Sequence, residues 1–151
     1  MIKVLFVCLG NICRSPMAEF VFKNLVKERG IEDSFYIESA ATSSEEVGNG
    51  MHRGTKNKLK EMNIPYTNHI ARQLLQGDYE NYDYIICMDR SNILNILGIC
   101  GEDKEKKIYK LLDFTKNPRD IADPWYTGNF DETYNDVVEG CQCFLDFVFK
   151  K

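Results

Sequence analysis

The sequence predicts an α/β fold in which four parallel strands form a central sheet between two layers of helices. Two observations support this prediction. Short apolar segments, typical of strands buried on both faces, alternate along the chain with longer segments whose apolar residues recur at helical spacing. The 151 residues are enough to bury one core, so we expect a single three-layer α/β/α domain over residues 1–151.

The first half of the chain is expected to supply two strands and two helices. Apolar residues at 2–7 predict the first strand, and helical spacing at 17–29 predicts the crossover helix that follows it. Residues 35–40 predict the second strand, and residues 51–62 predict the second helix. The segment 69–78 is mixed, and we expect only a short helix there.

The second half repeats the alternation. Residues 84–88 predict the third strand, ahead of a helix that ends near Leu97, and residues 108–114 predict the fourth strand. Residues 115–130 contain two prolines and no periodicity, which predicts a long surface loop. Residues 131–149 carry one broad apolar face and predict a helix that packs on the sheet.

Composition limits the classes of partner. A net charge of −4 argues against nucleic-acid binding, which usually requires a basic face. No segment approaches the ~18 apolar residues of a membrane span, and the apolar N-terminus is too short for a signal peptide. The six cysteines occur in a chain that is long enough to fold without disulfides. We therefore expect a cytoplasmic monomer that binds neither nucleic acid nor membrane.

The most informative segment is the loop of residues 8–15, which joins the first strand to the first helix. A strand that stops at a Gly-bearing turn and leads into a helix leaves several backbone N–H groups around one point, where the helix dipole is positive. Such a point favours an anion. Arg14 adds a planar guanidinium that matches two oxygens of a phosphate.

The same donors favour an ionised Cys8. A thiolate gains hydrogen bonds and dipole stabilisation that a free thiol, with a pKa of about 8.5, lacks. A cysteine at a strand end is often only a small packing residue, but Gly10 and Arg14 in the same loop favour a nucleophile. The backbone N–H groups of residues 9–14 are expected to face the remaining phosphate oxygens. The loop residues expected to bind the substrate are Leu9, Gly10, Asn11, Ile12, Cys13 and Ser15.

Four motifs follow one another along the chain: Cys8-(five residues)-Arg14-Ser15, His69–Gln73, Asp83–Asp89 and Asp123–Tyr126. With these motifs, in this order, the chain closely resembles the low-molecular-weight protein tyrosine phosphatases over nearly its whole length. This resemblance implies an enzyme without metal or other cofactor that hydrolyses phosphotyrosine in proteins, and small aryl phosphates, through a cysteinyl-phosphate intermediate. In that mechanism Arg14 and the loop amides hold the phosphoryl oxygens while Cys8 attacks phosphorus.

A proton donor for the leaving group is expected in the loop before the last helix. Asp123 is the best candidate, because Pro124 biases it to an extended backbone and the resemblance implies a general acid at this position. Asp120 is the nearby alternative. Trp125 and Tyr126 are expected to wall a deep pocket in which phosphotyrosine, but not the shorter phosphoserine, reaches the nucleophile.

Polar residues are expected to support the loop from behind. We expect the hydroxyl of Ser15 to donate a hydrogen bond to the Cys8 sulfur. We also expect the side-chain amide of Asn11 to stabilise the loop through hydrogen bonds. The resemblance implies supporting roles for Asn11, Ser15, Ser39 and His69.

The second cysteine of the loop raises the possibility of redox control. Cys13 follows Cys8 on a loop that curls back, and the resemblance implies that a disulfide between them would reversibly block the nucleophile. The alternative is a cysteine that never oxidises. The other four cysteines are interpreted as structural: Cys87, Cys100, Cys141 and Cys143.

Glu45 and Glu46 depart from the family pattern, which often has an aromatic residue in this segment beside the active site. Two carboxylates there would repel acidic residues next to a phosphotyrosine. We therefore predict a preference for substrates with basic residues near the phosphotyrosine.

Four alternative functions remain open from the sequence. A phosphoarginine phosphatase resembles this chain, but has Thr where Ile12 stands. An arsenate reductase would need further redox cysteines, for which Cys100 qualifies better than Cys87 inside an apolar strand. Intact catalytic residues argue against a phosphotyrosine-binding module without catalysis, and the lack of C-x2-C pairs argues against a cysteine-ligated metal protein.

Overall fold

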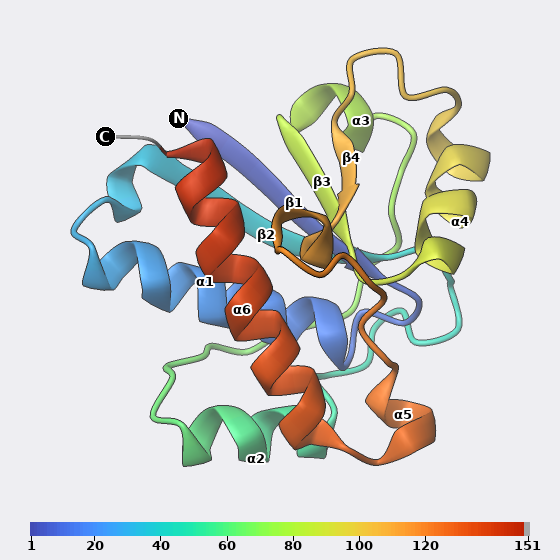
Figure 1. Cartoon of the computed structure of the whole chain (residues 1–151). Helices are drawn as coiled ribbons and strands as arrows, with labels where there is room; N and C mark the ends of the chain where they lie inside the picture. Colours follow the sequence, from blue (N-terminus) through green and yellow to red (C-terminus); the bar gives the residue numbers. More distant parts are fainter. Residues whose placement is uncertain (150–151) are drawn as a thin grey trace.

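The computed structural model describes residues 1–149 and has a parallel four-stranded sheet between two layers of helices, which confirms the predicted fold class (Figure 1). The strand order is β2-β1-β3-β4. The strands are β1 (Ile2–Cys8), β2 (Phe35–Ala41), β3 (Tyr84–Cys87) and β4 (Ile108–Lys110).

Both faces of β1 are covered from Val4 onward, which explains the uninterrupted apolar sequence of residues 4–8. Successive side chains of a strand point to opposite faces, so Val4 and Phe6 pack on one side and Leu5 and Val7 on the other. The first side is covered by α1 (Arg14–Glu28) and α6 (Phe130–Val148), and the second by α3 (Asp78–Asn81) and α4 (Arg90–Cys100).

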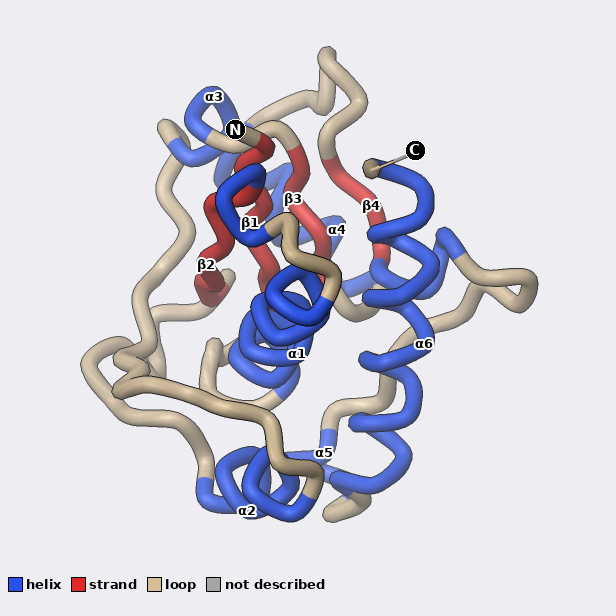
Figure 2. Tube along the Cα trace, turned by 90° about the vertical axis from the view of Figure 1, so that its left-hand side faces the viewer, coloured by secondary structure: helices blue, strands red, loops and turns tan. Residues whose placement is uncertain are grey.

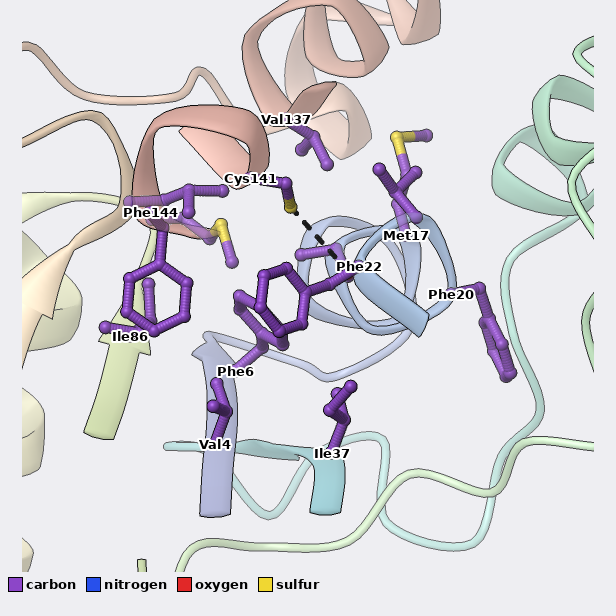
Figure 3. Close-up of a cluster of buried hydrophobic side chains, with 14 of the residues drawn as sticks. Val4, Phe6, Met17, Phe20, Phe22, Ile37, Ile86, Val137, Cys141 and Phe144 are labelled. Atoms are coloured by element: carbon purple, nitrogen blue, oxygen red, sulfur yellow. Dashed lines mark hydrogen bonds between the residues drawn. The ribbon is translucent and has the colours of Figure 1, made fainter. Parts of the chain in front are cut away.

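The larger core lies between the sheet, α1 and α6, as Figure 3 shows. Phe22 of α1 stacks at a tilt on Phe144 of α6, with ring centroids 5.3 Å apart, and both rings contact Phe6 of β1. Cys141 donates from Sγ to the carbonyl of Ala18 at 3.9 Å, and it is fully buried in this core. These contacts fix α1 against the sheet, and with it the loop that precedes α1.

The strand order creates a switch point beside β1. From β1 the chain crosses to β2 on one side, whereas β3 crosses to β4 on the other, and ligands of such sheets bind at the carboxyl ends of the strands where the order reverses. Figures 1 and 2 show α2 (Arg53–Glu61) and α5 (Pro124–Thr127) beyond these carboxyl ends. Cys8 ends β1 at this edge of the sheet.

Several helix boundaries differ from the prediction by a few residues. Helix α1 begins at Arg14 and not at Met17, because Pro16 lies in the first turn, where its missing N–H is not needed. Helix α4 continues to Cys100, past the predicted end near Leu97. Helices α2 and α6 match their predicted segments within two residues.

The helix expected within residues 69–78 is wrong, because residues 69–75 have no helical structure and a turn at residues 76–77 leads into α3. Its backbone groups bond to distant segments: Ala71 N donates to Asn49 O at 2.8 Å, and Leu74 N donates to Ala41 O at 2.7 Å. No helix is therefore formed until Asp78.

The fourth strand is shorter than predicted. After Lys110 the chain turns into a short 3-10 helix, Leu111–Phe114, since the Asp113 carboxylate accepts from Lys110 N at 2.9 Å. The predicted loop 115–130 is irregular, as expected, except for the single turn of α5.

Candidate active site

The loop after β1 curls around the sulfur of Cys8. Three donors surround Sγ: the backbone N–H groups of Asn11 at 3.3 Å and Ser15 at 3.4 Å, and the Ser15 hydroxyl at 3.0 Å. The curl depends on Asn11, whose φ of 58° lies in the left-handed region that asparagine tolerates better than most residues. The arrangement stabilises negative charge on a sulfur that is only 3% exposed.

Further N–H groups of the loop remain available to an anion. Within residues 1–149, the N–H groups of Gly10, Ile12 and Cys13 donate to no protein acceptor. They lie on the turn that leads into α1, where the positive end of the helix dipole adds to their effect. The site predicted for a phosphate is therefore rich in unused donors.

Arg14 is held at the other side of this turn and is 2% exposed. Its Nη1 donates to Asp89 Oδ2 at 2.6 Å and to the carbonyl of Ile121 at 2.8 Å, and its Nη2 lies 3.4 Å from Asp123 Oδ2. Burial opposes the charge of the guanidinium, but Cys8 and the two carboxylates outweigh burial and raise the pKa of Arg14 above its ordinary value. Arg14 thus stays cationic in the cavity.

Asp123 and Asp120 occupy different environments. Asp123 lines the same cavity as Cys8, and it caps α5 by accepting from Trp125 N at 3.0 Å. Asp120 accepts instead from Arg90 N at 3.2 Å and from Lys110 Nζ at 2.9 Å. Its carboxylate is therefore occupied by structural contacts, which favours Asp123 as the proton donor.

The cavity brings together residues from three segments that are far apart in sequence. The loop of residues 8–15, which we call the nucleophile loop, forms its floor. Ser43, Glu45 and Glu46 form one side, and the turn of α5 forms another. Trp125 and Tyr126 are 57% and 76% exposed, so their rings stand at the rim. The lining residues are Cys8, Leu9, Gly10, Ile12, Cys13, Arg14, Ser43, Glu45, Glu46, Asp123, Trp125 and Tyr126.

Asn11 and Ser15 lie behind the loop and not on the cavity, and both are fully buried. Asn11 Nδ2 donates to Ser15 Oγ at 2.8 Å and to Ser39 Oγ at 2.9 Å. His69 Nε2 is 2.8 Å from Asn11 O, so all four residues expected to support the loop meet in one network. The network holds the left-handed turn and the hydroxyl that faces Cys8.

Three supporting residues were missed from the sequence. Glu19 accepts from Ser39 Oγ at 2.6 Å, Arg72 N donates to Asn11 Oδ1 at 3.2 Å, and Asp89 pairs with Arg14. Asp89 had a usable signal, because it lies two residues after the end of β3 and the ends of adjacent parallel strands lie together at the switch point. Glu19 also had a usable signal in the sequence, because it is a carboxylate on the apolar face of a helix.

Residues 3–151 match the family model described as low molecular weight phosphotyrosine protein phosphatase. The chain belongs to this family.

One curated relative is the low molecular weight protein-tyrosine-phosphatase YfkJ of Bacillus subtilis, which is 40% identical to this chain. The alignment covers 100% of this chain and 98% of YfkJ. The structure of the low molecular weight protein tyrosine phosphatase SP-PTP from Streptococcus pyogenes superposes with a TM-score of 0.90 at 43% identity, covering 100% of this chain and 95% of SP-PTP. The structure of the Drosophila arginine phosphatase DARP superposes with a TM-score of 0.88 at 33% identity, covering 99% of this chain and 100% of DARP.

The loop of residues 8–15 places a second thiol, that of Cys13, on the same cavity. Burial, together with the charges of Cys8 and Asp123, raises the pKa of Cys13 to about 12. Cys13 is therefore a neutral thiol at physiological pH, which separates its chemistry from that of a thiolate. Its disulfide with Cys8 stays a prediction, and both are free cysteines here. Cys87 is fully buried, as expected for a structural residue.

The two glutamates that depart from the family pattern do line the cavity. The side chain of Glu46 lies over Gly10, where a Cβ would stand 3.4 Å from Glu46 Cγ, and Glu46 Oε1 accepts from Asn49 Nδ2 at 3.0 Å. In the described part of the chain, neither carboxylate forms an ion pair. Their charge is therefore available to a substrate.

Among residues 1–149, no helix is both long and apolar enough to cross a membrane.

Proposed function

We propose that this protein hydrolyses phosphotyrosine in proteins, and small aryl phosphates, with Cys8 as nucleophile and Asp123 as general acid. One observation carries the proposal: the Cys8 sulfur, the Arg14 guanidinium and the Asp123 carboxylate line one cavity whose floor also presents unused N–H groups. Family membership supports the same chemistry. The expected setting is the cytoplasm, where the protein acts as a monomer.

The first step transfers the phosphoryl group to sulfur. The Cys8 thiolate attacks phosphorus in line, the bond from phosphorus to the phenolic oxygen breaks, and Asp123 gives its proton to that oxygen. Arg14 and the N–H groups of the loop hold the three equatorial oxygens as their charge redistributes. The Ser15 hydroxyl, 3.0 Å from the sulfur, stabilises the thiolate before attack.

The second step releases phosphate. Water attacks phosphorus of the cysteinyl-phosphate and the S–P bond breaks, which regenerates the thiolate. Asp123, now ionised, takes the proton of that water and returns to its acid form. Arg14 and the loop amides are used in both steps, because both transition states place charge on the same equatorial oxygens.

The rim supports an aromatic substrate. Trp125 and Tyr126 stand above a buried sulfur, so a substrate must extend from the rim to the floor to react. A phenyl ring spans such a distance and gains contact with the aromatic wall, whereas the single carbon of a phosphoserine side chain does not. Phosphotyrosine is therefore favoured over phosphoserine.

A peptide panel tests the proposal. In the presence of EDTA, the wild-type protein should hydrolyse a phosphotyrosine peptide with a kcat/KM well above those for matched phosphoserine and phosphoarginine peptides. Phosphoarginine is the second candidate, since DARP is an arginine phosphatase and the two free glutamates of the cavity suit a guanidinium. Faster hydrolysis of phosphoarginine would replace the proposal with that candidate.

Glu45 and Glu46 are expected to select the residues around the phosphotyrosine. Basic residues beside the phosphotyrosine are attracted by these two unpaired carboxylates. Each exposed ion pair that forms should raise kcat/KM roughly two- to fivefold. Acidic residues at the same place are repelled and should lower kcat/KM by a similar factor. Measurements on basic-flanked and acidic-flanked peptides at low salt should show this preference. Substituting both glutamates by glutamine should abolish it, while the distant Glu102→Gln keeps it. Equal kcat/KM values for both peptides in the wild type would refute this expectation.

A further inference from the structure

Helix α2 begins at an imidazole that is tied to the nucleophile loop. His52 is the N-cap of α2: its Nδ1 accepts from Gly54 N at 2.9 Å, which places the proton of the neutral ring on Nε2. Its own backbone N–H donates to the carbonyl of Ile12 at 2.8 Å. The ring therefore has a defined position relative to the cavity floor.

A second contact fixes the plane of the imidazole. The ring of Phe130, the first residue of α6, stacks on His52 with centroids 5.3 Å apart and an interplanar angle of 23°. Phe130 can lie this close to the start of α2 because residue 54 is glycine, and any Cβ at Gly54 would overlap the Phe130 ring. The imidazole is thus held by a helix cap on one side and an aromatic ring on the other.

The third contact of His52 is with the wall of the cavity. The indole of Trp125 meets the imidazole edge to face, with centroids 5.7 Å apart and an angle of 80°. Among the described aromatic side chains, His52 is the one whose ring packs with Trp125. Trp125 is 57% exposed, so few neighbours surround it, and the contact with His52 restrains the direction of its ring.

The position of Trp125 is coupled to that of Asp123. The Trp125 N–H donates to Asp123 Oδ1 at 3.0 Å, and Tyr126 N donates to Asp123 O at 3.1 Å, so one turn of backbone carries the indole and the carboxylate together. Helix α5 has only four residues and little packing of its own, because Pro124 is its one buried residue. A contact that restrains the indole therefore also restrains this turn.

We propose that His52 is a positioning residue for the aromatic wall: its imidazole, fixed by α2 and Phe130, holds Trp125 at the rim where the substrate ring packs. This inference rests on the proposed function for its kinetic consequence. We expect the ring of His52 to affect aromatic substrates and not inorganic phosphate. Among the described residues, the hydrogen bond between His52 and the loop of residues 8–15 uses the backbone N–H of His52, and the ring nitrogen Nδ1 bonds to Gly54 N instead.

Two variants distinguish the effect of the His52 ring from the effect of His52 as the N-cap of α2. His52→Asn keeps a good N-cap acceptor and removes the ring, whereas His52→Phe keeps an aromatic ring and removes the acceptor. Trp125 is the only tryptophan of the chain, so intrinsic fluorescence reports on it directly. Three quantities are measured: tryptophan emission with its quenching by acrylamide, KM for p-nitrophenyl phosphate, and the rise in melting temperature caused by inorganic phosphate.

In His52→Asn, we expect a red-shifted and more easily quenched emission, and a KM raised roughly two- to tenfold by loss of the aromatic contact. Stabilisation by inorganic phosphate should be unchanged. His52→Phe should restore emission and bring KM within about twofold of wild type, with a lower melting temperature, because α2 loses its cap.

Wild-type emission and KM in His52→Asn would overturn the proposal. So would an equal rise of KM in both variants, because the cap and not the ring would then be responsible. A loss of phosphate stabilisation in His52→Asn that matches the rise in KM would also overturn it, as general damage to the cradle. The fluorescence and phosphate measurements need no turnover, so an inactive wild type would refute the proposed function and leave this test valid.

Discussion

The Cys8→Ser variant should lose at least about 10⁴-fold in kcat toward p-nitrophenyl phosphate and phosphotyrosine peptides. A serine hydroxyl is not ionised at neutral pH, and the described hydrogen-bond partners at this position are two backbone N–H groups and the Ser15 hydroxyl, none of which is a general base. The three donors that surround Sγ stabilise an anion, which a neutral hydroxyl does not provide. The variant should still bind phosphotyrosine, because Arg14 and the loop amides are unchanged.

Turnover is measured with EDTA present, and folding is checked by the melting temperature. The matched control is Cys143→Ser, which changes a half-buried thiol on α6 and should keep wild-type activity. Appreciable turnover by Cys8→Ser would show that the nucleophile lies elsewhere. Because Cys8→Ser should bind without turnover, phosphoproteins that co-purify with it are candidates for the physiological substrate.

The Asp123→Asn variant should lower kcat for phosphotyrosine by roughly 10²- to 10⁴-fold, the range typical of a missing general acid. Asparagine is chosen because its side-chain oxygen can still accept from Trp125 N and cap α5. The loss should be smaller with p-nitrophenyl phosphate, because the nitro group stabilises the phenolate and reduces its need for a proton.

Asp120→Asn is the matched control for this variant. Its carboxylate accepts from Arg90 N and Lys110 Nζ, and its loss should lower stability slightly and leave most of the activity. If Asp120→Asn were the more damaging variant, or if Asp123→Asn slowed both substrates equally, Asp123 would not be the proton donor.

The parts of the site that were predictable are those that local sequence determines. An apolar strand, a Gly-bearing turn and a helix follow one another within 8–15, so the anion-binding geometry around Cys8 could be inferred from a few residues. The contacts of Ser15 with the sulfur, and of Asn11 with its neighbours, are as expected. The same is true of the two central strands, β1 and β3, because each contains a continuous apolar run.

The parts that were not predictable depend on contacts between distant segments. The segment before α3 was assigned a short helix because its own residues are ambiguous, whereas its partners, Ala41 and Asn49, decide that it is extended. Asp123 approaches Arg14 across 109 positions of sequence. Pro124 and the family resemblance pointed to Asp123 as the proton donor, but no local pattern indicated that it would lie beside Arg14. The contact between His52 and Trp125 had no signal in the sequence, because neither residue recurs with a pattern that places it at the cavity.

Selective alkylation of Cys8 is the most direct test of the central claim that this loop holds an ionised sulfur and a phosphate in one cradle. Burial raises the pKa of each of the other five thiols, that of Cys13 to about 12, so below neutral pH all five are neutral and unreactive. At mildly acidic pH, iodoacetamide should therefore modify Cys8 alone, as mapped by mass spectrometry, and orthovanadate should protect it. Modification of another cysteine in place of Cys8, or reactivity that orthovanadate leaves unchanged, would contradict the account.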